Sequence, residues 1–357
     1  MPLFSKRASQ NKSFKTRVAD FWEWFPAVAD RFYATIEEGR CPDLGPEVSE
    51  QMESILPHLA WVFGPGVGNG HSFTVSGDGI VAKQLLAEYW LSQAPKIEGW
   101  TFYGSRQPSS SDDLAGMAIS LGEGQQIDVE HLMVSTSVDE EQRVVHLEAW
   151  HEAMQQVPEE HRMQILFLLL DEALGEFGTE TWLGSIEISP SLDLTQSKSL
   201  LQLPDFLSQV ENYYQWNKLS PLRSISTYQM QEQHNGPRGD TFVGSTVISS
   251  VVFEFLESGG RGFENPLEGT GGELAYLILE NRIFPDGQEA DVRGNIEDAI
   301  GEALESQASG RSLGGAFGYN QSYIDLLLLD GEESRSIVDK TLESLQLTSE
   351  ASWAKFA

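Results

Sequence analysis

The residues best suited to hold a ligand lie in one stretch, GRSLGGAFGYNQSYIDLLLLD, which runs from Gly310 to Asp330. Its glycines could let the backbone approach a phosphate group, and Arg311, Tyr319 and Asn320 could hold an anion or a peptide. A nucleotide-binding loop places its glycines between a strand and a helix whose N-terminus faces the phosphate. Here the glycines lead into a strand, and neither GK[ST] nor GxGxxG occurs. We therefore expect the glycines to shape a tight, bulged hairpin edge, with any ligand contact secondary.

Asp325 is the one carboxylate inside the apolar run YIDLLLL of this stretch. On a strand it would share a face with Tyr323 and Leu327. A buried carboxylate without a partner costs several kcal/mol, so Asp325 must reach solvent or pair with an arginine, for example Arg311 or Arg293. The candidate ligand-binding residues are therefore Arg311, Tyr319, Asn320 and Asp325.

Other familiar sites are not indicated by the sequence. The glycine-rich run from Gly64 to Gly70 precedes a strand and lacks lysine. Like the stretch from Gly310, it therefore does not have the pattern of a nucleotide-binding loop. His146 and His151 are five residues apart, whereas a zincin helix needs its two histidines four apart. No calcium-binding DxDxDG loop occurs. No GxSxG nucleophile elbow is expected, because the letters GRSLG at 310–314 lead into a strand and not into a helix. We expect no metal, no cofactor and no assignable catalytic residue.

The charge of the chain restricts its partners. The 357 residues carry 54 acidic and 23 basic side chains, a formal net charge of −31. The first 17 residues run against this trend, with five basic residues and no carboxylate. An acidic body repels phosphate backbones and anionic membranes. We expect no nucleic acid and no membrane among the partners, and a cationic protein as the partner that fits.

Cysteine content and hydropathy indicate the compartment. The one cysteine, Cys41, cannot form an intrachain disulfide, which fits a reducing compartment. Its neighbourhood offers only Arg40 and no base, so an inert side chain is expected. No apolar segment of a secretory signal precedes Phe21. The longest apolar run, from Ile165 to Leu170, is far shorter than a membrane span. The sequence predicts a soluble, cytoplasmic protein.

The pattern of helices and strands predicts an α+β protein. Helical periodicity is strong after Arg17 and after Pro158, whereas paired strand-like segments follow at 129–148 and 312–329. We expect two α/β-sandwich-like domains with mixed or antiparallel sheets, the second of them ferredoxin-like. The expected organisation is a disordered basic tail at 1–16, a first domain at 17–190, a serine-rich linker at 191–203 and a second domain at 204–357.

Three segments of the chain resemble recurring features of a bacterial protein family of unassigned function. They are FWEWF near the start, LDEALGE within the helix that begins at Leu168, and GGAFGYNQSYIDL near the end. The resemblance touches both halves of the chain and rests on about a tenth of it. It implies a bacterial, cytosolic origin and no particular activity.

Two functions are compatible with these features. The favoured hypothesis is a non-catalytic interaction or regulatory protein whose acidic surface binds a cationic partner. The alternative is a hydrolase-type enzyme with a site in a cleft between domains, near the stretch from Gly310 to Asp325. An enzyme needs a place where carboxylate, histidine or arginine side chains with shifted pKa values converge. A binding protein needs an exposed apolar patch or an open sheet edge.

Overall fold

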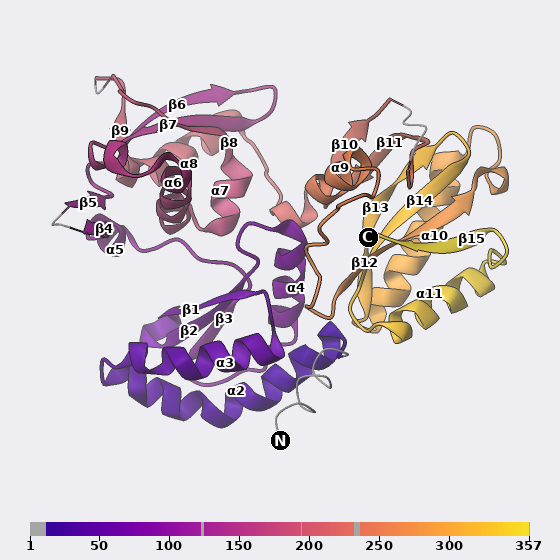
Figure 1. Cartoon of the computed structure of the whole chain (residues 1–357), viewed down its shortest axis with the longest axis horizontal. Helices are drawn as coiled ribbons and strands as arrows, with labels where there is room; N and C mark the ends of the chain where they lie inside the picture. Colours follow the sequence, from indigo (N-terminus) through magenta and orange to yellow (C-terminus); the bar gives the residue numbers. More distant parts are fainter. Residues whose placement is uncertain (1–11, 123–124, 194, 232–235, 357) are drawn as a thin grey trace. The chain divides into compact units, whose positions relative to one another are not determined.

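The computed structural model describes residues 12–122, 125–193, 195–231 and 236–356. The chain has an α+β fold with mixed and antiparallel sheets, as the sequence predicts (Figure 1). No helix of the described residues combines the length and the apolar character that crossing a bilayer requires. The chain divides into two compact units, and each is built from separate segments. Unit 1 contains Met1–Phe73, Ile80–Phe102 and Ser224–Ala357, and unit 2 contains Thr74–Gly79 and Tyr103–Arg223.

The expected linker at 191–203 contains regular structure. It includes strand β9 (Lys198–Ser199) and the short 3-10 helix η4 (Leu200–Gln202). Leu200 and Leu203 are buried in the core of unit 2, which continues along the chain to Arg223. The apolar residues that end this polar segment therefore hold it in place. Most of the expected basic tail, residues 1–11, lies outside the described residues, and helix α2 already begins at Phe14.

The N-terminal part of unit 1 is packed around aromatic side chains. Helix α2 (Phe14–Glu37) continues through Pro26, and Phe21, Phe25 and Phe32 on one side of it are fully buried. The rings of Phe21 and Phe25 meet that of Phe73, with centroids 5.7 and 5.2 Å apart. The other elements here are α3 (Gly45–Ile55), α4 (Val81–Ser92) and a sheet of order β1-β2-β3, formed by Ala60–Pro65, His71–Ser76 and Trp100–Tyr103.

The C-terminal part of unit 1 is a six-stranded antiparallel sheet. Its order is β10-β11-β13-β14-β12-β15. From β12 onward the elements follow the sequence βαββαβ with β14 inserted between β12 and β13, which is the ferredoxin-like arrangement. The strands are β10 (Ser226–Gln229), β11 (Thr241–Thr246), β12 (Glu273–Glu280), β13 (Gly310–Gly318), β14 (Gln321–Leu328) and β15 (Ala351–Lys355).

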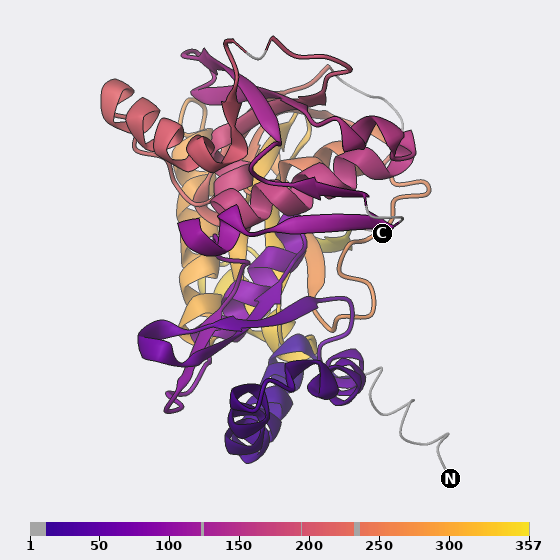
Figure 2. The same ribbon diagram turned by 90° about the vertical axis from the view of Figure 1, so that its left-hand side faces the viewer.

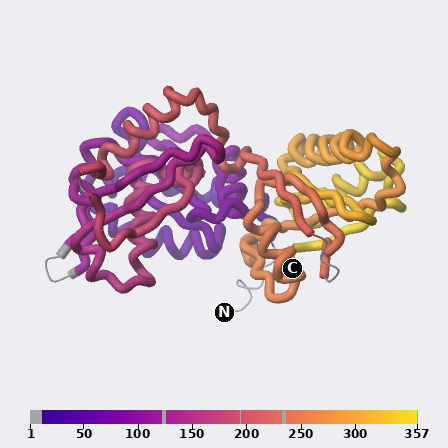
Figure 3. Tube along the Cα trace, turned by 90° about the horizontal axis from the view of Figure 1, so that it is seen from above, coloured from indigo at the N-terminus to yellow at the C-terminus, as the bar shows by residue number. Residues whose placement is uncertain are grey.

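Helices cover both faces of this sheet. Helices α10 (Glu289–Ser306) and α11 (Glu332–Ser344) pack on one face, where alternate residues of β12 and β14 such as Leu277 and Ile324 form the core. Seen from above, the coil of α10 runs beside the strands (Figure 3). On the opposite face, helix α9 (Ser249–Glu257) brings Phe255 to within 6.1 Å of the ring of Tyr276.

Unit 2 contains a four-stranded sheet with helices on one side. The strand order is β8-β7-β6-β9, in which β7 and β8 are parallel and the other pairs antiparallel. Helices α6 and α7 lie below β6 and β7 in Figure 1, and Figure 2 shows the same ribbon turned by 90°. Apart from β9, the strands of unit 2 are β4 (Ala118–Gly122), β5 (Gln125–Asp128), β6 (Met133–Asp139), β7 (Val144–Trp150) and β8 (Leu183–Ile188). The helices are α5 (Ser111–Ala115), α6 (Glu159–Leu174), α7 (Glu176–Trp182) and α8 (Leu203–Tyr214).

Candidate functional site

The glycine-rich stretch forms a strand and a bulged hairpin, as expected, but β13 lies inside the sheet and not at its edge. Strand β13 pairs with β11 on one side and with β14 on the other, and a bulge interrupts the second pairing between Ser312 and Gly314. A side chain at Gly315 would overlap the carbonyl of Tyr323 and the guanidinium of Arg293. Gly314 has a φ of 108°, which few other residues adopt. The glycines are therefore required by close backbone approach within the sheet.

The turn of this hairpin already holds an anion, the carboxylate of Asp240. Oδ2 of Asp240 accepts hydrogen bonds from the backbone N–H groups of Asn320 and Gln321, at 2.9 and 3.1 Å. Its Oδ1 accepts a hydrogen bond from the hydroxyl of Tyr323. Burial, and then this bond to Asp240, raise the pKa of Tyr323. The backbone N–H groups that could have bound a phosphate are thus used by the chain itself.

The four candidate ligand residues do not converge on one place. Arg311 forms an ion pair with Glu88, at 3.4 Å between Nη1 and Oε2. Tyr319 is exposed and packs on Phe242, with ring centroids 5.0 Å apart. Asn320 contributes its backbone to the turn. Only Asp325 among them is fully buried.

Asp325 is paired with an arginine, but not with either of the two that the sequence suggested. Nη1 of Arg238 lies 2.6 Å from Oδ1 of Asp325, and both side chains are completely buried. Arg311 instead forms its ion pair with Glu88. Arg293 instead donates to the carbonyl of Tyr323. The expected partners were therefore wrong, whereas the requirement for an arginine was correct.

Aromatic rings enclose this buried pair. The guanidinium carbon of Arg238 lies 5.1, 4.7 and 5.6 Å from the ring centroids of Tyr276, Tyr323 and Phe356. Burial raises the pKa of Asp325, and the guanidinium of Arg238 opposes that rise. Because a charged guanidinium at 2.6 Å strongly favours the carboxylate, we describe the pair as ionised.

The surroundings of Arg238 leave no room for a substrate. Nε and Nη2 of Arg238 and Oδ2 of Asp325 have no hydrogen-bond partner within the described structure. The adjoining cavity, between Arg238, Thr241 and Leu256, has a volume of about 10 Å³. That is room for about one water molecule. The pair is therefore a structural element of the sheet, and Arg238 was missed because 87 residues separate it from Asp325.

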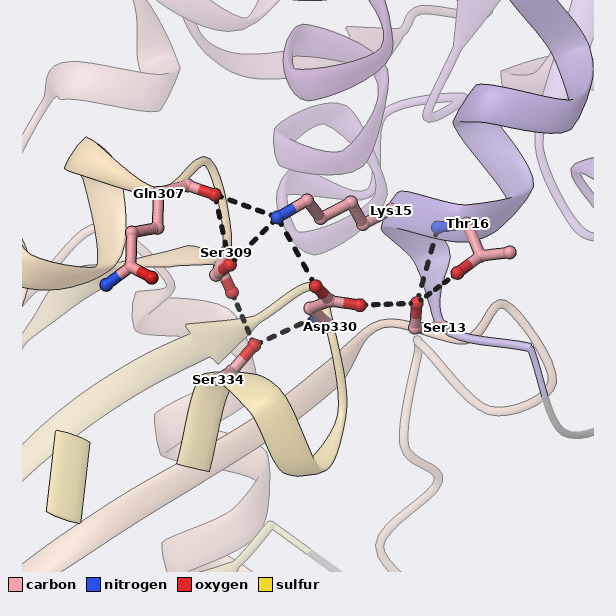
Figure 4. A network of polar contacts seen from close by, with 7 residues as sticks. All are labelled: Ser13, Lys15, Thr16, Gln307, Ser309, Asp330 and Ser334. Carbon is pink, nitrogen blue, oxygen red and sulfur yellow. Dashed lines mark hydrogen bonds and ion pairs between the residues drawn. The ribbon is translucent and has the colours of Figure 1, made fainter. Parts of the chain in front are cut away.

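A second polar network joins the start of α2 to the end of β14 (Figure 4). Nζ of Lys15 contacts the carbonyl of Gln307 at 2.8 Å and Oδ2 of Asp330 at 3.3 Å. Ser13, which caps α2, donates its hydroxyl to Oδ1 of Asp330 at 2.9 Å. Ser334 donates to the carbonyl of Ser309 at 2.6 Å. Every group in the network bonds to another part of the chain, so it ties elements of unit 1 together.

Asp171, a carboxylate on helix α6, belongs to a polar cluster of unit 2. Burial raises its pKa, and Oδ2 lies 3.8 Å from Nη1 of Arg106. Nearby, the buried carboxylate of Glu176 accepts the hydroxyl of Ser76 at 2.7 Å and the N–H of Gly79 at 3.1 Å. These contacts fasten the segment 74–79 to α7.

A serine, a histidine and an aspartate also meet in unit 2, on strands β8, β7 and β6. Oγ of Ser185 lies 2.9 Å from Nδ1 of His146, and Nε2 of His146 lies 3.5 Å from Oδ2 of Asp139. However, the backbone N–H of Ser185 also donates to Nδ1, at 2.9 Å. In a serine hydrolase the N–H of the nucleophile helps to bind the oxyanion.

The local geometry explains this contact without catalysis. The parallel pairing of β7 with β8 is irregular beside His146, between the pairs Val145–Leu183 and Leu147–Ile186. A bulge leaves a backbone N–H without a partner in the ladder. The imidazole of His146 accepts that N–H from Ser185. The arrangement is therefore best explained as the closure of a bulge.

The histidines do not form a metal centre in the described residues. No group of three or more histidine, cysteine, aspartate or glutamate side chains there is arranged to hold a metal ion. His151, which follows His146 by five residues, is buried, and its Nε2 lies 3.6 Å from Oδ2 of Asp128. His131 binds the other oxygen of Asp128, at 2.6 Å. This contact raises the pKa of His131, and despite partial burial the pKa of Asp128 is lowered.

The surface with the clearest chemical character is the outer layer formed by α10 and α11. Within these two helices, all of whose residues are described, Lys340 is the one exposed cation. Arg293 pairs with Glu297 at 3.2 Å, and Arg335 pairs with Glu273, so both are engaged. The exposed carboxylates of the layer, which we call the acidic face, are Glu289, Asp291, Asp298, Glu302, Glu305, Glu332, Glu333, Asp339 and Glu343.

Comparison with protein-family models, with curated proteins and with solved structures finds no match for this chain. The geometry of the described residues is therefore the basis for any statement about function.

Proposed function

We propose that the chain is a non-catalytic interaction or regulatory protein of the bacterial cytosol, which binds a cationic protein partner through its acidic surface. The observation that supports this proposal is the acidic face on α10 and α11, where exposed carboxylates have Lys340 as their one exposed counter-charge. Such a surface attracts basic protein segments and repels nucleic acids and anionic lipids.

The acidic face also lowers the stability of unit 1 when no cationic partner is bound. Asp298 and Glu302 are four residues apart on α10, and Glu302 and Glu305 are three apart. Like charges at these spacings destabilise a helix by about 0.2–0.5 kcal/mol per pair. A cationic partner relieves this repulsion, so binding and folding of unit 1 are coupled.

This coupling gives a direct test. The thermal unfolding of the full chain should be measured at low salt with a poly-lysine peptide of about 20 residues and with poly-glutamate of equal length. A ligand at about 100 times its Kd stabilises the native state by about 2.7 kcal/mol. We expect poly-lysine to raise the Tm, poly-glutamate to leave it unchanged, and added salt to remove the effect. An unchanged Tm with poly-lysine would contradict the proposal.

The hydrolase alternative has less support. It requires a nucleophile, a base and an oxyanion site that converge. Ser185 and His146 come closest to this among the residues discussed above, and the N–H that an oxyanion would need is bonded to the imidazole.

A further inference from the structure

Unit 2 contains a groove with apolar walls. Its volume is about 520 Å³, and it is lined by residues of α5, α6, α7, η4 and α8. This volume falls within the range of about 300–1,000 Å³ that is usual for ligand sites. Its apolar lining residues are Pro108, Leu114, Ala173, Leu174, Trp182, Leu201, Pro204 and Leu207.

An exposed apolar stripe leads along α6 into this groove. Leu174 lines the groove, and Phe167 and Met163 precede it by seven and eleven residues on the same helix. Residues at these separations lie on the same side of an α-helix. Phe167 is 41% exposed and Met163 is 36% exposed. The apolar surface therefore extends beyond the groove itself.

The charged groups of the groove have one sign. Asp205 and Glu211, both exposed on α8, are its charged lining residues, and none of the described lining residues is a lysine, arginine or histidine. The nearby Lys218 does not line the groove, and its ammonium is already engaged, because it lies 4.9 Å from the ring centroid of Trp182 and donates to the carbonyl of Thr181. An occupant that complements the groove is apolar on one side and positively charged at its edges.

The groove also favours one backbone conformation for its occupant. Its walls come mainly from helices, whose N–H and C=O groups are bonded within the helix. An extended peptide would find few partners there for its own backbone, whereas a helix satisfies its backbone internally. We propose that this groove binds a basic amphipathic helix of a protein partner, with its large apolar side chains between α6 and α8 and its lysine or arginine residues beside Asp205 and Glu211. The proposal concerns unit 2 alone and does not depend on the acidic face.

The test is a binding measurement with a defined probe. A fluorescent peptide of about 18 residues, with leucine at i, i+3, i+4 and i+7 and lysine elsewhere, is titrated with the full chain, and its anisotropy is followed. A peptide of the same composition in scrambled order reports binding by charge alone. We expect the amphipathic peptide to bind at least about tenfold more tightly than the scrambled one.

Two substitutions address the groove, each with a matched control. Ser208→Phe fills the groove from an exposed position of α8, whereas Gln209→Phe adds the same ring at the next exposed residue, outside the lining. Glu211→Lys reverses a charge in the groove, and Glu141→Lys makes the same change in the exposed β6–β7 turn. We expect each groove variant to weaken binding by about tenfold and each control to change it by less than about twofold.

Three results would overturn the proposal. The first is equal binding of the scrambled peptide, which would leave only the charge attraction of the proposed function. The second is equal affinity for Ser208→Phe and Gln209→Phe, which would place the peptide elsewhere. The third is a sedimentation measurement in which the parent chain is a dimer and Ser208→Phe is a monomer, because the groove would then hold a second copy of the chain.

Discussion

Nη1 of Arg238 and Oδ1 of Asp325 lie 2.6 Å apart, with both side chains fully buried, although the two residues are 87 positions apart in the sequence. The pair connects the segment before β11 to the middle of β14. Removing one partner of a buried ion pair leaves an uncompensated charge, which usually costs more than the pair contributed.

Asp325→Asn should therefore destabilise unit 1 by about 3–5 kcal/mol. The measurement is urea-induced unfolding followed by tryptophan fluorescence. The control is Arg311→Ala, which breaks the partly exposed pair with Glu88 and should cost less than about 1 kcal/mol. The double variant Arg238→Met with Asp325→Leu should recover much of the loss, because no charge stays buried. Similar costs for Asp325→Asn and Arg311→Ala would refute this account of the pair.

Gly315→Ala should lower the Tm clearly, because the new methyl group overlaps the carbonyl of Tyr323 and the side chain of Arg293. Gly294→Ala is the matched control. It lies within α10 with open space around it, so the change should stabilise the chain by about 0.5–1 kcal/mol. Differential scanning calorimetry compares the two. If both variants raise the Tm, the close approach at β13 is not a constraint.

The contact between His131 and Asp128 makes the stability of unit 2 depend on pH. The hydrogen bond that the imidazole of His131 donates to the carboxylate of Asp128 raises the pKa of His131, so the folded state holds this proton more tightly than the unfolded state. The resulting stabilisation is present below the unfolded pKa of His131 and is lost as the pH rises through its folded pKa. His131→Asn should therefore lower the Tm more at about pH 5.5 than at about pH 8. Equal losses at the two pH values would show that His131 contributes no proton linkage.

Ser185 should not react as a nucleophile. Incubation of the full chain with a fluorophosphonate probe, followed by mass spectrometry, should leave Ser185 unmodified, because its N–H is bonded to His146. His146→Ala should instead lower the stability of unit 2, because it removes the acceptor at the bulge. Labelling of Ser185 that disappears in His146→Ala would establish a Ser–His nucleophile and favour the hydrolase alternative.

Local patterns predicted the elements but not their distant partners. The glycines and the apolar run predicted the positions of β13 and β14. Close approach of neighbouring strands requires glycine, and a buried strand requires apolar side chains, so both features can be read from the residue types. The cost of a buried carboxylate also predicted an arginine for Asp325. Arg238 and Asp240 carried no local signal, since each reaches the hairpin only through the pairing of β11 with β13.

The acidic surface and the expected linker also depend on contacts between residues that are distant in the sequence. The net charge predicts a cationic partner, but only the packing of α10 and α11 shows which carboxylates share one face. The segment 191–203 was expected to be a linker because it is rich in serine and lacks a clear period. Leu200 and Leu203 of this segment are nevertheless buried in the core of unit 2.

The central claim is that the acidic face on α10 and α11 binds a cationic protein. The most direct measurement is the affinity of the full chain for poly-lysine of about 20 residues at low salt, by isothermal titration calorimetry. It should be repeated on the triple variant Asp298→Asn, Glu302→Gln and Glu305→Gln. A control triple variant, Glu130→Gln, Glu141→Gln and Glu152→Gln, removes the same charge from exposed positions of unit 2.

The account predicts that the α10 triple variant weakens binding by about tenfold, whereas the control triple variant weakens it by less than about twofold. Equal affinities for the two triple variants would contradict the claim, because the attraction would then come from the net charge of the chain and not from the acidic face.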